Sequence, residues 1–595
     1  MCGIAGYVGY KVATPFVLDC LQKLEYRGYD SAGIAFTQND SLCRLRVLGG
    51  VDNLKRAVSQ DVIDSSVMIG HTRWATHGRV SVENAHPQMS NHHDVAVVHN
   101  GIIENFDNLK AELQSTGVTF ESQTDTEIIP NMIHNNLTGY TDTQILDALQ
   151  KTTRRLQGSF ALCVLVSKVD KIFATARFSP LLFVKSDYGF MVASDLGALP
   201  NGEKYKLLDD YFAVISKEGI SFFDKDMQPV TLQKLDITNT QQDEGHLGFD
   251  SYMAKEVSQG GDAIRNTCKN LIESNALDIA CTELFTHTFR IVITACGTAL
   301  HAGRILGYML QKECGIECVI DYASEFRYFP PHIDEETVCI FISQSGETAD
   351  TLSCVEFAKT KQARTLGITN VPTSRLAGMV DYCILSSAGA ERAVASTKVL
   401  MAQLAIIYML VQKICKILNK SCEFSFKDIL DCANKLDRLK SVSKLDKITR
   451  ILQHKQSLFV LGRGLDYLTA LEGALKIKEV SYIHCEALPL GELKHGSLAL
   501  FNNDSYCIVL MTQKHLMAKT INNIHEITTR GAHVILITNM DVSVDVDYVI
   551  KIDCQDTLSP IPAIKVLQIL ALKLAKIKKI DVDKPRNLAK SVTVE

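Results

Sequence analysis

The chain lacks the features that would place it in a membrane or in a secretory pathway. Its most apolar stretch, residues 399–418, is interrupted by Gln403, Gln412, Lys413 and Lys416, whereas a membrane span needs about 20 nearly uncharged residues. This stretch is therefore predicted to be a buried helix. The N-terminal residues also lack a charged segment followed by a long apolar one, so no secretory signal is expected. These absences predict a cytoplasmic protein that does not insert into a membrane.

Patterns typical of metal and nucleic acid binding are missing as well. The 18 cysteines form no CxxC pair and share no zinc-type spacing with histidines, so we expect reduced thiols and no metal or other cofactor. The net charge is −5 without a large basic block, which leaves no electrostatic basis for binding nucleic acid. The chain contains a single tryptophan, Trp74.

The chain does have enough residues for several domains. At roughly 100–200 residues per domain, its 595 residues correspond to three or four folding units. Short apolar runs between helical patterns predict an α+β unit over residues 1–235, and a polar stretch over 236–250 predicts a linker. Short buried strands then alternate with longer helices, which is typical of parallel sheets with crossover helices. We predict two such α/β domains, 251–425 and 426–585, and a C-terminal tail, 586–595.

The two predicted α/β domains share a faint internal repeat. Ile368-Thr369-Asn370 recurs as Ile537-Thr538-Asn539, and each copy is followed by a short strand that opens with Asp-Tyr. Upstream, the apolar run 338–342 matches the run 506–510 at a similar spacing. Ordered matches with preserved spacing predict two copies of one α/β unit.

Cys2 is the first residue whose chemistry could matter beyond packing. Removal of Met1 would give Cys2 a free α-amino group, whose reference pKa is about 7.7–8.0. Such an amine can act as the general base for the thiol of its own residue, as in N-terminal nucleophile enzymes. Taken alone, Cys2 is better explained as a small apolar residue at the end of the chain. Whether Met1 is removed is left open.

Motifs across the first 235 residues change that interpretation. They are CGIAG (2–6), YRGYDSAG (26–33), HTRWATHG (71–78), NAHP (84–87), HNGIIEN (99–105) and TDTE (124–127). Together they resemble the class II glutamine amidotransferase domain. The resemblance implies an α+β N-terminal nucleophile sandwich that releases ammonia from glutamine.

The resemblance also implies roles for single side chains. Cys2 would attack the glutamine amide carbon and form a thioester, and Asn100 with the N–H of Gly101 would stabilise the oxyanion. The residues that would bind glutamine are Arg73, Thr76, His77 and Asp125. Trp74 would gate an ammonia passage, in place of the core packing that is usual for tryptophan. The alternative for the others is a surface ion pair or a turn residue.

A second candidate site follows the apolar run 338–342. Ser343-Gln344-Ser345-Gly346-Glu347-Thr348 places hydroxyl groups and a glycine at a predicted strand-to-helix turn. The free N–H groups and the partial positive charge of a helix N-terminus suit a phosphate group there. By itself, the turn is explained equally well as a helix cap without a ligand.

Further motifs favour the phosphate interpretation. They are ACGT (295–298), ASEFRY (323–328), VASTK (394–398), LGRG (461–464), EGALKIKE (472–479), GELKHG (491–496) and PRNLAKSVTVE (585–595). They resemble the paired sugar isomerase (SIS) domains of glucosamine-6-phosphate synthases. Nearly the whole chain is thus similar to the bacterial-type glutamine–fructose-6-phosphate aminotransferase family. The resemblance implies the substrates glutamine and fructose 6-phosphate, and a product, glucosamine 6-phosphate, that begins amino sugar biosynthesis.

The second resemblance implies another set of roles. Lys590 would form a Schiff base with the C2 carbonyl, and Glu479 would move the proton between C1 and C2. His495 would open the sugar ring and comes from the partner subunit in this family, which implies a homodimer. The residues that would bind the sugar phosphate are Thr298, Ser343, Gln344, Ser345, Thr348 and Ser396, and those that would support the pocket are Lys476 and Glu492.

Two departures from the family pattern leave open how well the sugar is bound. Ala299 stands where the family has a serine, and Ser258-Gln259-Gly260-Gly261 stands where it has Glu-Gln-Pro. A third departure is Gly496-Ser497-Leu498, which stands where the family has Gly-Pro-Leu. The linker is also short and lacks the long insert of the eukaryotic forms, which favours a bacterial-type enzyme without feedback by nucleotide sugars.

Two other functions compete with this interpretation. One is an amidotransferase acting on another phosphosugar, such as phosphoribosyl pyrophosphate, although nothing in the chain resembles a pyrophosphate loop. The other is a regulatory protein that senses sugar phosphates with the same SIS domains. A regulator would not need Cys2, Glu479, His495 and Lys590 together.

Overall fold

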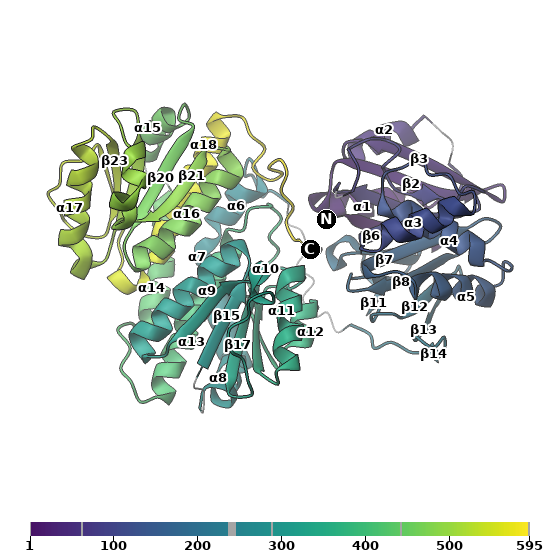
Figure 1. The fold of residues 1–595 in the computed structure, drawn as a ribbon, viewed down its shortest axis with the longest axis horizontal. Helices are drawn as coiled ribbons and strands as arrows, with labels where there is room; N and C mark the ends of the chain where they lie inside the picture. Colours follow the sequence, from purple (N-terminus) through teal and green to yellow (C-terminus); the bar gives the residue numbers. More distant parts are fainter. Residues whose placement is uncertain are drawn as a thin grey trace. The chain divides into compact units, whose positions relative to one another are not determined.

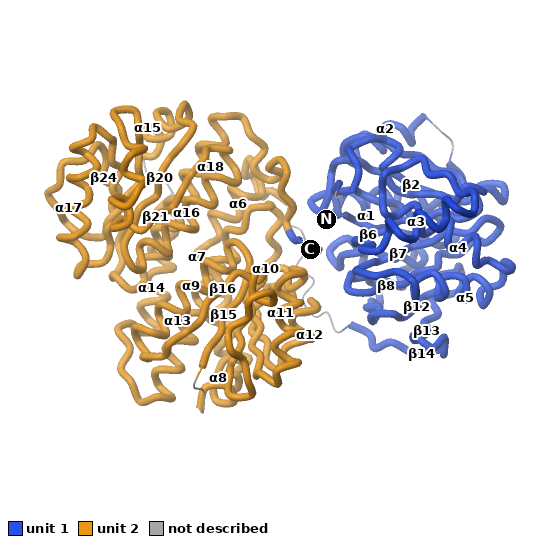
Figure 2. The backbone as a smooth tube through the Cα atoms, viewed as in Figure 1, with its two compact units in different colours: residues 1–243, 591–594 blue, residues 244–590, 595 orange. Residues whose placement is uncertain are grey.

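The computed structural model describes residues 2–60, 63–75, 77–235, 245–286, 290–440 and 443–592. The chain forms two compact units, residues 1–243 with 591–594 and residues 244–590 with 595 (Figure 2). The predicted site residue Thr76 and most of the predicted linker lie outside the described residues. The domain limits drawn from the sequence stay predictions.

The first unit contains two seven-stranded sheets. The first sheet has the order β11-β9-β10-β1-β4-β2-β3 and the second β14-β13-β12-β8-β7-β6-β5. The strands of the first are β1 (Gly3–Gly9), β2 (Ser31–Gln38), β3 (Ser41–Leu48), β4 (Val67–Arg73), β9 (Leu182–Ser186), β10 (Gly189–Ala193) and β11 (Glu203–Lys206). Those of the second are β5 (Gln88–Met89), β6 (Val95–Ile103), β7 (Gly158–Val166), β8 (Ile172–Arg177), β12 (Phe212–Ile215), β13 (Ile220–Phe223) and β14 (Pro229–Val230). All pairings between these strands are antiparallel.

The sheets are stacked, with helices on their outer faces (Figure 1). Successive side chains of a strand point to opposite faces. In β1, Ile4 and Val8 pack into the core between the sheets, whereas Ala5 and Tyr7 pack against an outer helix. The helices are α1 (Thr14–Leu24), α2 (Val51–Val58), α3 (Phe106–Ser115), α4 (Ile128–Asn136) and α5 (Asp142–Thr153). This arrangement confirms the predicted α+β sandwich.

The second unit contains two five-stranded parallel sheets with the same topology. Their orders are β16-β15-β17-β18-β19 and β21-β20-β22-β23-β24. The first has β15 (Arg290–Ala295), β16 (Cys318–Tyr322), β17 (Thr337–Ser343), β18 (Arg364–Thr369) and β19 (Tyr382–Leu385). The second has β20 (Ser457–Gly462), β21 (His484–Pro489), β22 (Tyr506–Met511), β23 (His533–Thr538) and β24 (Tyr548–Lys551). The repeat predicted from the sequence falls on matching strands, β17–β19 and β22–β24, and is confirmed.

Helices cover both parallel sheets (Figure 1). They are α6 (Tyr252–Ser258), α7 (Gly260–Ser274), α8 (Ala276–Phe285), α9 (Gly297–Met309), α10 (Ala323–Phe326), α11 (Ala349–Thr360), α12 (Arg375–Met379), α13 (Lys398–Ile417), α14 (Phe426–Leu436), α15 (Ser443–Leu452), α16 (Leu465–Ser481), α17 (Met517–Thr528) and α18 (Pro560–Ile577). Helix α14, placed by the sequence at the start of the second domain, contributes Ile429 and Leu436 to the core around the first parallel sheet.

Helix α13 is the apolar stretch that the sequence analysis placed in a core. Among the described residues it is the one helix long and apolar enough to cross a membrane, and 78% of its apolar window is buried inside the unit. Leu404 and Ile407, for example, are fully buried in the core around the first parallel sheet. The helix is thus a core helix of this unit.

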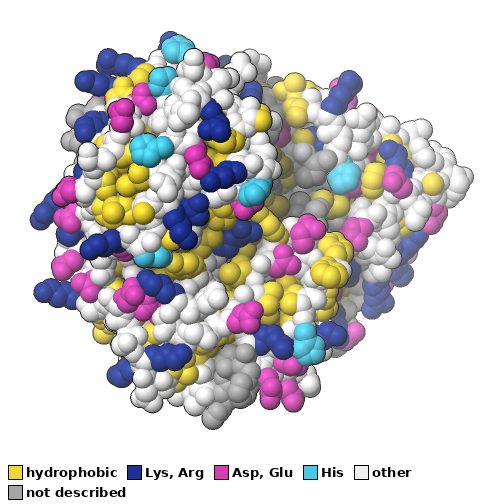
Figure 3. Space-filling view, turned by 60° about the vertical axis from the view of Figure 1, so that its left-hand side comes forward, with side chains coloured by type: hydrophobic (Ala, Val, Ile, Leu, Met, Phe, Trp, Pro, Cys, Tyr) yellow, Lys and Arg dark blue, Asp and Glu magenta, His cyan; other side chains and the backbone are white. Residues whose placement is uncertain are grey.

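Charged side chains of both signs are interspersed on one face of the molecule (Figure 3). On the face shown in Figure 3, lysines and arginines lie between aspartates and glutamates, and no continuous basic area is seen. This distribution agrees with the net charge of −5.

Candidate active sites

Cys2 directly precedes β1, a strand in the middle of its sheet. The backbone N–H of Trp74 donates to Cys2 Sγ at 3.3 Å, because β1 pairs with β4 and the chain leaves β4 at that residue. Gly3 allows this close pairing, since a Cβ there would lie 2.6 Å from Thr72 Oγ1. Burial raises the pKa of the Cys2 thiol above its ordinary value, although the nearby Arg73 opposes the shift. The thiol therefore needs a base to become a nucleophile.

The two predicted oxyanion residues lie beside Cys2 on β6. The Asn100 side-chain amide donates from Nδ2 to the backbone oxygen of Cys2 at 3.1 Å. Gly101 has a φ of +137°, and a Cβ there would lie 2.0 Å from the Ser159 oxygen of the neighbouring strand β7. This position therefore requires glycine.

Arg73 and Asp125 supply charges of opposite sign to the same pocket. Arg73 is buried and donates from Nη2 to the backbone oxygen of His77, while its Nη1 is buried without a hydrogen-bond partner among the described residues. Asp125 is also buried and accepts from the N–H of Ile103 at 2.8 Å. An unused guanidinium donor beside a carboxylate fits the two charged ends of an amino acid.

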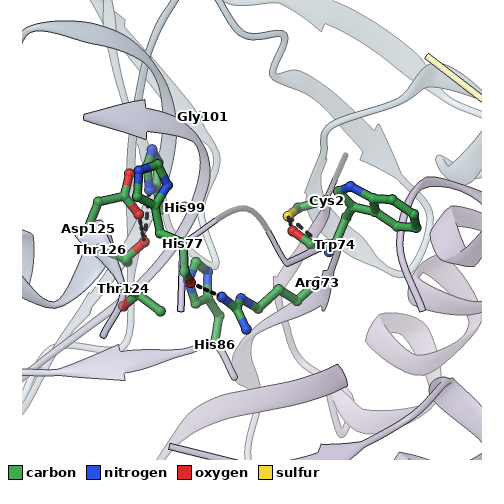
Figure 4. Close-up of a pocket in the computed structure, with 10 residues that line it drawn as sticks. All are labelled: Cys2, Arg73, Trp74, His77, His86, His99, Gly101, Thr124, Asp125 and Thr126. Atoms are coloured by element: carbon green, nitrogen blue, oxygen red, sulfur yellow. Dashed lines mark hydrogen bonds between the residues drawn. The ribbon is translucent and has the colours of Figure 1, made fainter. Parts of the chain in front are cut away.

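Figure 4 shows the pocket that these residues line, with Cys2 against Trp74 at one side and Asp125 near Thr126 and His99 at the other. Its lining residues are Cys2, Arg73, Trp74, His77, His86, His99, Gly101, Thr124, Asp125 and Thr126. Trp74 is half-buried and its ring meets that of Tyr29 edge to face at 5.8 Å between centroids. No role was predicted from the sequence for His86, His99, Thr124 or Thr126. Each stands in one of the motifs that carry the resemblance, which was the available signal.

The hydroxyl-rich loop of the second unit lies at the carboxyl end of β17, the middle strand of its sheet. Ser343 Oγ accepts from the N–H of Gly346 at 3.0 Å and lies 2.9 Å from Thr348 Oγ1. Gly346 has a φ of +65°, and a Cβ there would lie 2.2 Å from Ser374 Oγ. The loop leads into α11, so the hydroxyls of Ser343, Ser345 and Thr348 precede a helix N-terminus. In open parallel sheets, ligands bind at this edge.

A chain of polar and charged side chains joins α9 to α16. Thr298 Oγ1 donates to Glu472 Oε1 at 3.2 Å, and Lys476 Nζ donates to Glu479 Oε2 at 2.5 Å. Lys476 also lies 3.6 Å from Glu472. Burial disfavours the charge of Lys476, but Glu479 and Glu472 outweigh it and raise its pKa. Glu472 was missed by the sequence analysis although it opens the quoted motif, and its carboxylate also lies 2.7 Å from His301.

The side chain of Lys590 is buried in the described structure, unlike that of an ordinary lysine near a chain end. Its side chain is 4% exposed and Nζ donates to Glu391 Oε2 at 2.5 Å. The same oxygen accepts from Ser396 Oγ at 3.0 Å, and the other accepts from the N–H groups of Thr397 and Val399. Burial opposes the charge on Glu391, but Lys590 and these donors outweigh it and lower its pKa. Glu391 was not predicted from the sequence, although it lies three residues before the VASTK motif.

Segment 256–261 contains one of the departures from the family pattern. It is hydrogen-bonded to residues 392–398, which follow Glu391 in the chain. Glu256 Oε1 accepts from the N–H groups of Arg392 and Ala393 at 2.5 and 3.3 Å, and Gln259 Oε1 accepts from Lys398 at 3.0 Å. Gly261 permits α7 to approach α14, since a Cβ there would lie 2.8 Å from the Ala433 oxygen. The other departure, Ala299, packs its methyl group against the core around the first parallel sheet.

Glu492 and His495 stand apart from these clusters. Both are exposed in a short turn, η6 (Glu492–His495). Among the described residues, no hydrogen bond or ion pair joins either of them to another predicted site residue. By contrast, the negative charge of Glu391, which pairs with Lys590, helps to raise the pKa of Lys476 on α16. The residues around Lys590 and those around Lys476 are therefore electrostatically coupled.

Comparisons with known proteins agree with this two-part organisation. A model of the glutamine amidotransferase domain matches residues 71–201, and a model of the SIS domain matches residues 284–413 and 451–547. Glutamine–fructose-6-phosphate aminotransferase [isomerizing] from Clostridium perfringens (strain 13 / Type A) is 39% identical over 614 residues, covering all of both chains. The protein of that name from Methanosarcina acetivorans is 36% identical, again over the full length of both chains.

A solved structure also matches part of this chain. The C-terminal domain of glucosamine-fructose-6-phosphate aminotransferase from Francisella tularensis is 32% identical with a TM-score of 0.51, and the match covers 57% of this chain and 99% of that one. With relatives at this identity over its full length, the chain belongs to the glutamine–fructose-6-phosphate aminotransferase (isomerizing) family, whose members are enzymes.

Proposed function

We propose that this chain transfers the amide nitrogen of glutamine to fructose 6-phosphate and isomerises the product to glucosamine 6-phosphate, releasing glutamate. The observation that carries the acceptor half is the burial of Lys590 against Glu391 and Ser396. A lysine enclosed in this way beside a hydroxyl and a carboxylate is held in place for a bound carbonyl, which a solvated lysine near a chain end is not. The product would enter amino sugar synthesis.

The glutamine half acts through Cys2. After removal of Met1, the α-amine of Cys2 takes the thiol proton, and the thiolate attacks the amide carbon to form a thioester and release ammonia. Water then hydrolyses the thioester to glutamate. Asn100 and the Gly101 N–H carry the oxyanion charge, a contribution of about 3–4 kcal/mol per donor in comparable sites. Arg73 and Asp125, with Thr76 and His77, hold the two ends of glutamine, and Trp74 gates the ammonia.

The sugar half acts through Lys590. In this proposal the neutral amine of Lys590 adds to C2 of the open-chain sugar, and water leaves as the Schiff base forms. Ammonia displaces the lysine from the Schiff base, and Glu479, paired with Lys476, moves the proton between C2 and C1. Gln344, Ser343, Ser345 and Thr348 hold the phosphate, and Thr298 and Ser396 the sugar chain.

We infer that the working enzyme is a homodimer. His495, supported by Glu492, is exposed and joined to no other site residue within the described part of the chain, which suits a group that serves the site of a partner subunit. The cytoplasmic location stays a prediction from the sequence.

Product analysis tests the coupled reaction. Wild type and Cys2→Ala are each given glutamine and fructose 6-phosphate, and glutamate and glucosamine 6-phosphate are measured together. Equal amounts of both products from wild type, and no amino sugar from the variant, support the proposal. Glutamate alone from wild type would mean that the acceptor is another phosphosugar, or that the SIS domains serve sensing.

A further inference from the structure

Three buried imidazoles lie next to the glutamine pocket, and the mechanism above uses none of them. The ring centroids of His71 and His86 are 4.3 Å apart, and those of His86 and His99 are 6.4 Å apart. His86 and His99 line the pocket, whereas His71 lies behind it on β4 and is completely buried.

The position of His71 determines which of its ring nitrogens carries a proton. His71 Nε2 lies 2.9 Å from the backbone oxygen of His99 and 3.1 Å from Asn100 Oδ1. A carbonyl oxygen can only accept a hydrogen bond, so Nε2 must carry the hydrogen. This conclusion follows from the backbone of β6 alone, whichever way the Asn100 amide is turned.

The same hydrogen sets the orientation of the Asn100 amide. An asparagine side chain can present either its oxygen or its NH₂ group to a neighbour. Because His71 Nε2 is a donor, the NH₂ group of Asn100 would be repelled there, and Oδ1 is the atom that faces it. Nδ2 must then point the other way, where it lies 3.1 Å from the Cys2 oxygen. That contact uses one of its two hydrogens and leaves the other for an oxyanion at Cys2.

His71 keeps this arrangement without titrating in the ordinary working range. Burial lowers the pKa of His71 to about 3, against the opposing effect of its bonds to His99 and Asn100. Its Nδ1 is buried and has no hydrogen-bond partner among the described residues. The ring therefore stays neutral with its proton on Nε2.

We propose that His71 is a positioning residue for the glutamine half, which holds the Asn100 amide with its NH₂ group toward Cys2. The His99 carbonyl fixes the tautomer of His71, and the N–H of His71 in turn fixes the orientation of the Asn100 amide. The inference rests on the proposed function, because it takes Asn100 as an oxyanion donor.

Glutamine hydrolysis by full-length variants tests the proposal. His71→Leu removes the donor, and we expect kcat to fall about 10- to 100-fold with KM for glutamine changed less than about 3-fold, since the loss falls on the transition state. His71→Gln can restore an N–H donor and should recover most of the rate. In an Asn100→Ala background, His71→Leu should cause no further loss, because the two residues act as one unit.

Two further readouts separate this role from simple packing. Alkylation of Cys2 by iodoacetamide forms no oxyanion, so its rate should match wild type in His71→Leu, and the pH profile of hydrolysis should keep its shape. Independent and additive losses in the double variant, or an unchanged kcat in His71→Leu while Cys2→Ala abolishes hydrolysis, would overturn the His71 role and leave the proposed function intact. No hydrolysis by wild type would instead defeat the proposed function.

A measurement on the wild-type protein covers the case in which His71→Leu does not fold. Neutron diffraction from crystals of the full chain locates the exchangeable deuterium on the His71 ring. Deuterium on Nε2 supports the proposal, and deuterium on Nδ1 alone contradicts it.

Discussion

At the scale of single residues, burial changes what a common side chain can do. Lys590 and Glu391 lie 199 positions apart in the chain, and both side chains are almost fully removed from water. Removing such a pair from water is costly unless the geometry is good and further hydrogen bonds are present. Ser396, Thr397 and Val399 provide those bonds to Glu391.

Lys590→Arg should abolish sugar chemistry while glutamine hydrolysis continues. Arginine keeps the positive charge but cannot lose its proton, so it cannot form a Schiff base. We expect amino sugar synthesis to fall at least about 1,000-fold. Borohydride reduction in the presence of fructose 6-phosphate should add the mass of the sugar phosphate less one oxygen atom to the peptide of residue 590 in wild type only.

Lys576→Arg is the matched control for this experiment. Lys576 lies on α18 and pairs with Asp250 at the surface, so its replacement should change neither activity nor labelling. Persistent labelling or synthesis in Lys590→Arg would show that another lysine forms the adduct.

At the scale of secondary-structure elements, two carboxyl groups fasten the loop between β19 and α13. Glu256 on α6 accepts hydrogen bonds from the loop N–H groups at 392 and 393, and Glu391 accepts from the N–H of Thr397 in the loop and of Val399 in the first turn of α13. Glu256 Oε2 is buried without a hydrogen-bond partner among the described residues. Burial, and then the charge of Glu391, raise the pKa of Glu256, against opposing effects of Lys590, Lys398 and the Arg392 N–H.

Glu256→Gln should make stability less dependent on pH. A carboxyl whose pKa is raised in the folded state keeps its proton there after the unfolded chain has lost it, above the ordinary value of 4.5. Wild type therefore loses stability from this group as the pH rises above that value, whereas glutamine does not titrate. The Tm of the variant relative to wild type should increase between about pH 5 and pH 8.

An exposed glutamate supplies the comparison for that series. Glu335→Gln changes a carboxyl group on the surface of the same unit, and its Tm difference from wild type should stay nearly constant over the same range. A parallel response of the two variants would mean that Glu256 is ionised in the folded protein.

At the scale of the whole molecule, the predicted position of His495 in the partner's site makes subunit composition testable. His495→Ala and Lys590→Arg chains would each be inactive alone. If His495 acts in the partner's site, a mixed dimer has one site with both native residues. Random mixing of equal amounts should then restore about a quarter of the wild-type synthesis, since half the dimers are mixed and each has one working site.

The control mixture pairs two residues of the same site. Glu479→Gln mixed with Lys590→Arg leaves each site with one damaged residue, so activity should not return. Lack of recovery in the His495 mixture, with mixed dimers shown to form, would place His495 in the site of its own chain.

Much of the fold could be predicted because its signals are local. The strand at 338–342 and its counterpart at 506–510 are apolar runs bounded by polar residues, and turns such as the one at Gly346 need a residue that tolerates positive φ. Resemblance supplied the candidate residues at both sites. It did not supply Glu391, Glu472 or His71. The role of such a side chain depends on its contacts, and these come from residues that are distant in the chain.

The sequence by itself determined which chemical groups are available, a thiol at position 2, a hydroxyl-rich turn and a lysine near the end, together with the repeat that builds two parallel sheets. Only the tertiary structure decided which charges leave water and what they meet there. In the folded chain Lys590 pairs with Glu391, and Lys476 pairs with Glu472 and Glu479. His71 lies against the backbone carbonyl of His99, which fixes the ring nitrogen that carries its proton. The physical reason is that desolvation and hydrogen bonding depend on distances in space, and chain positions far apart become neighbours only on folding.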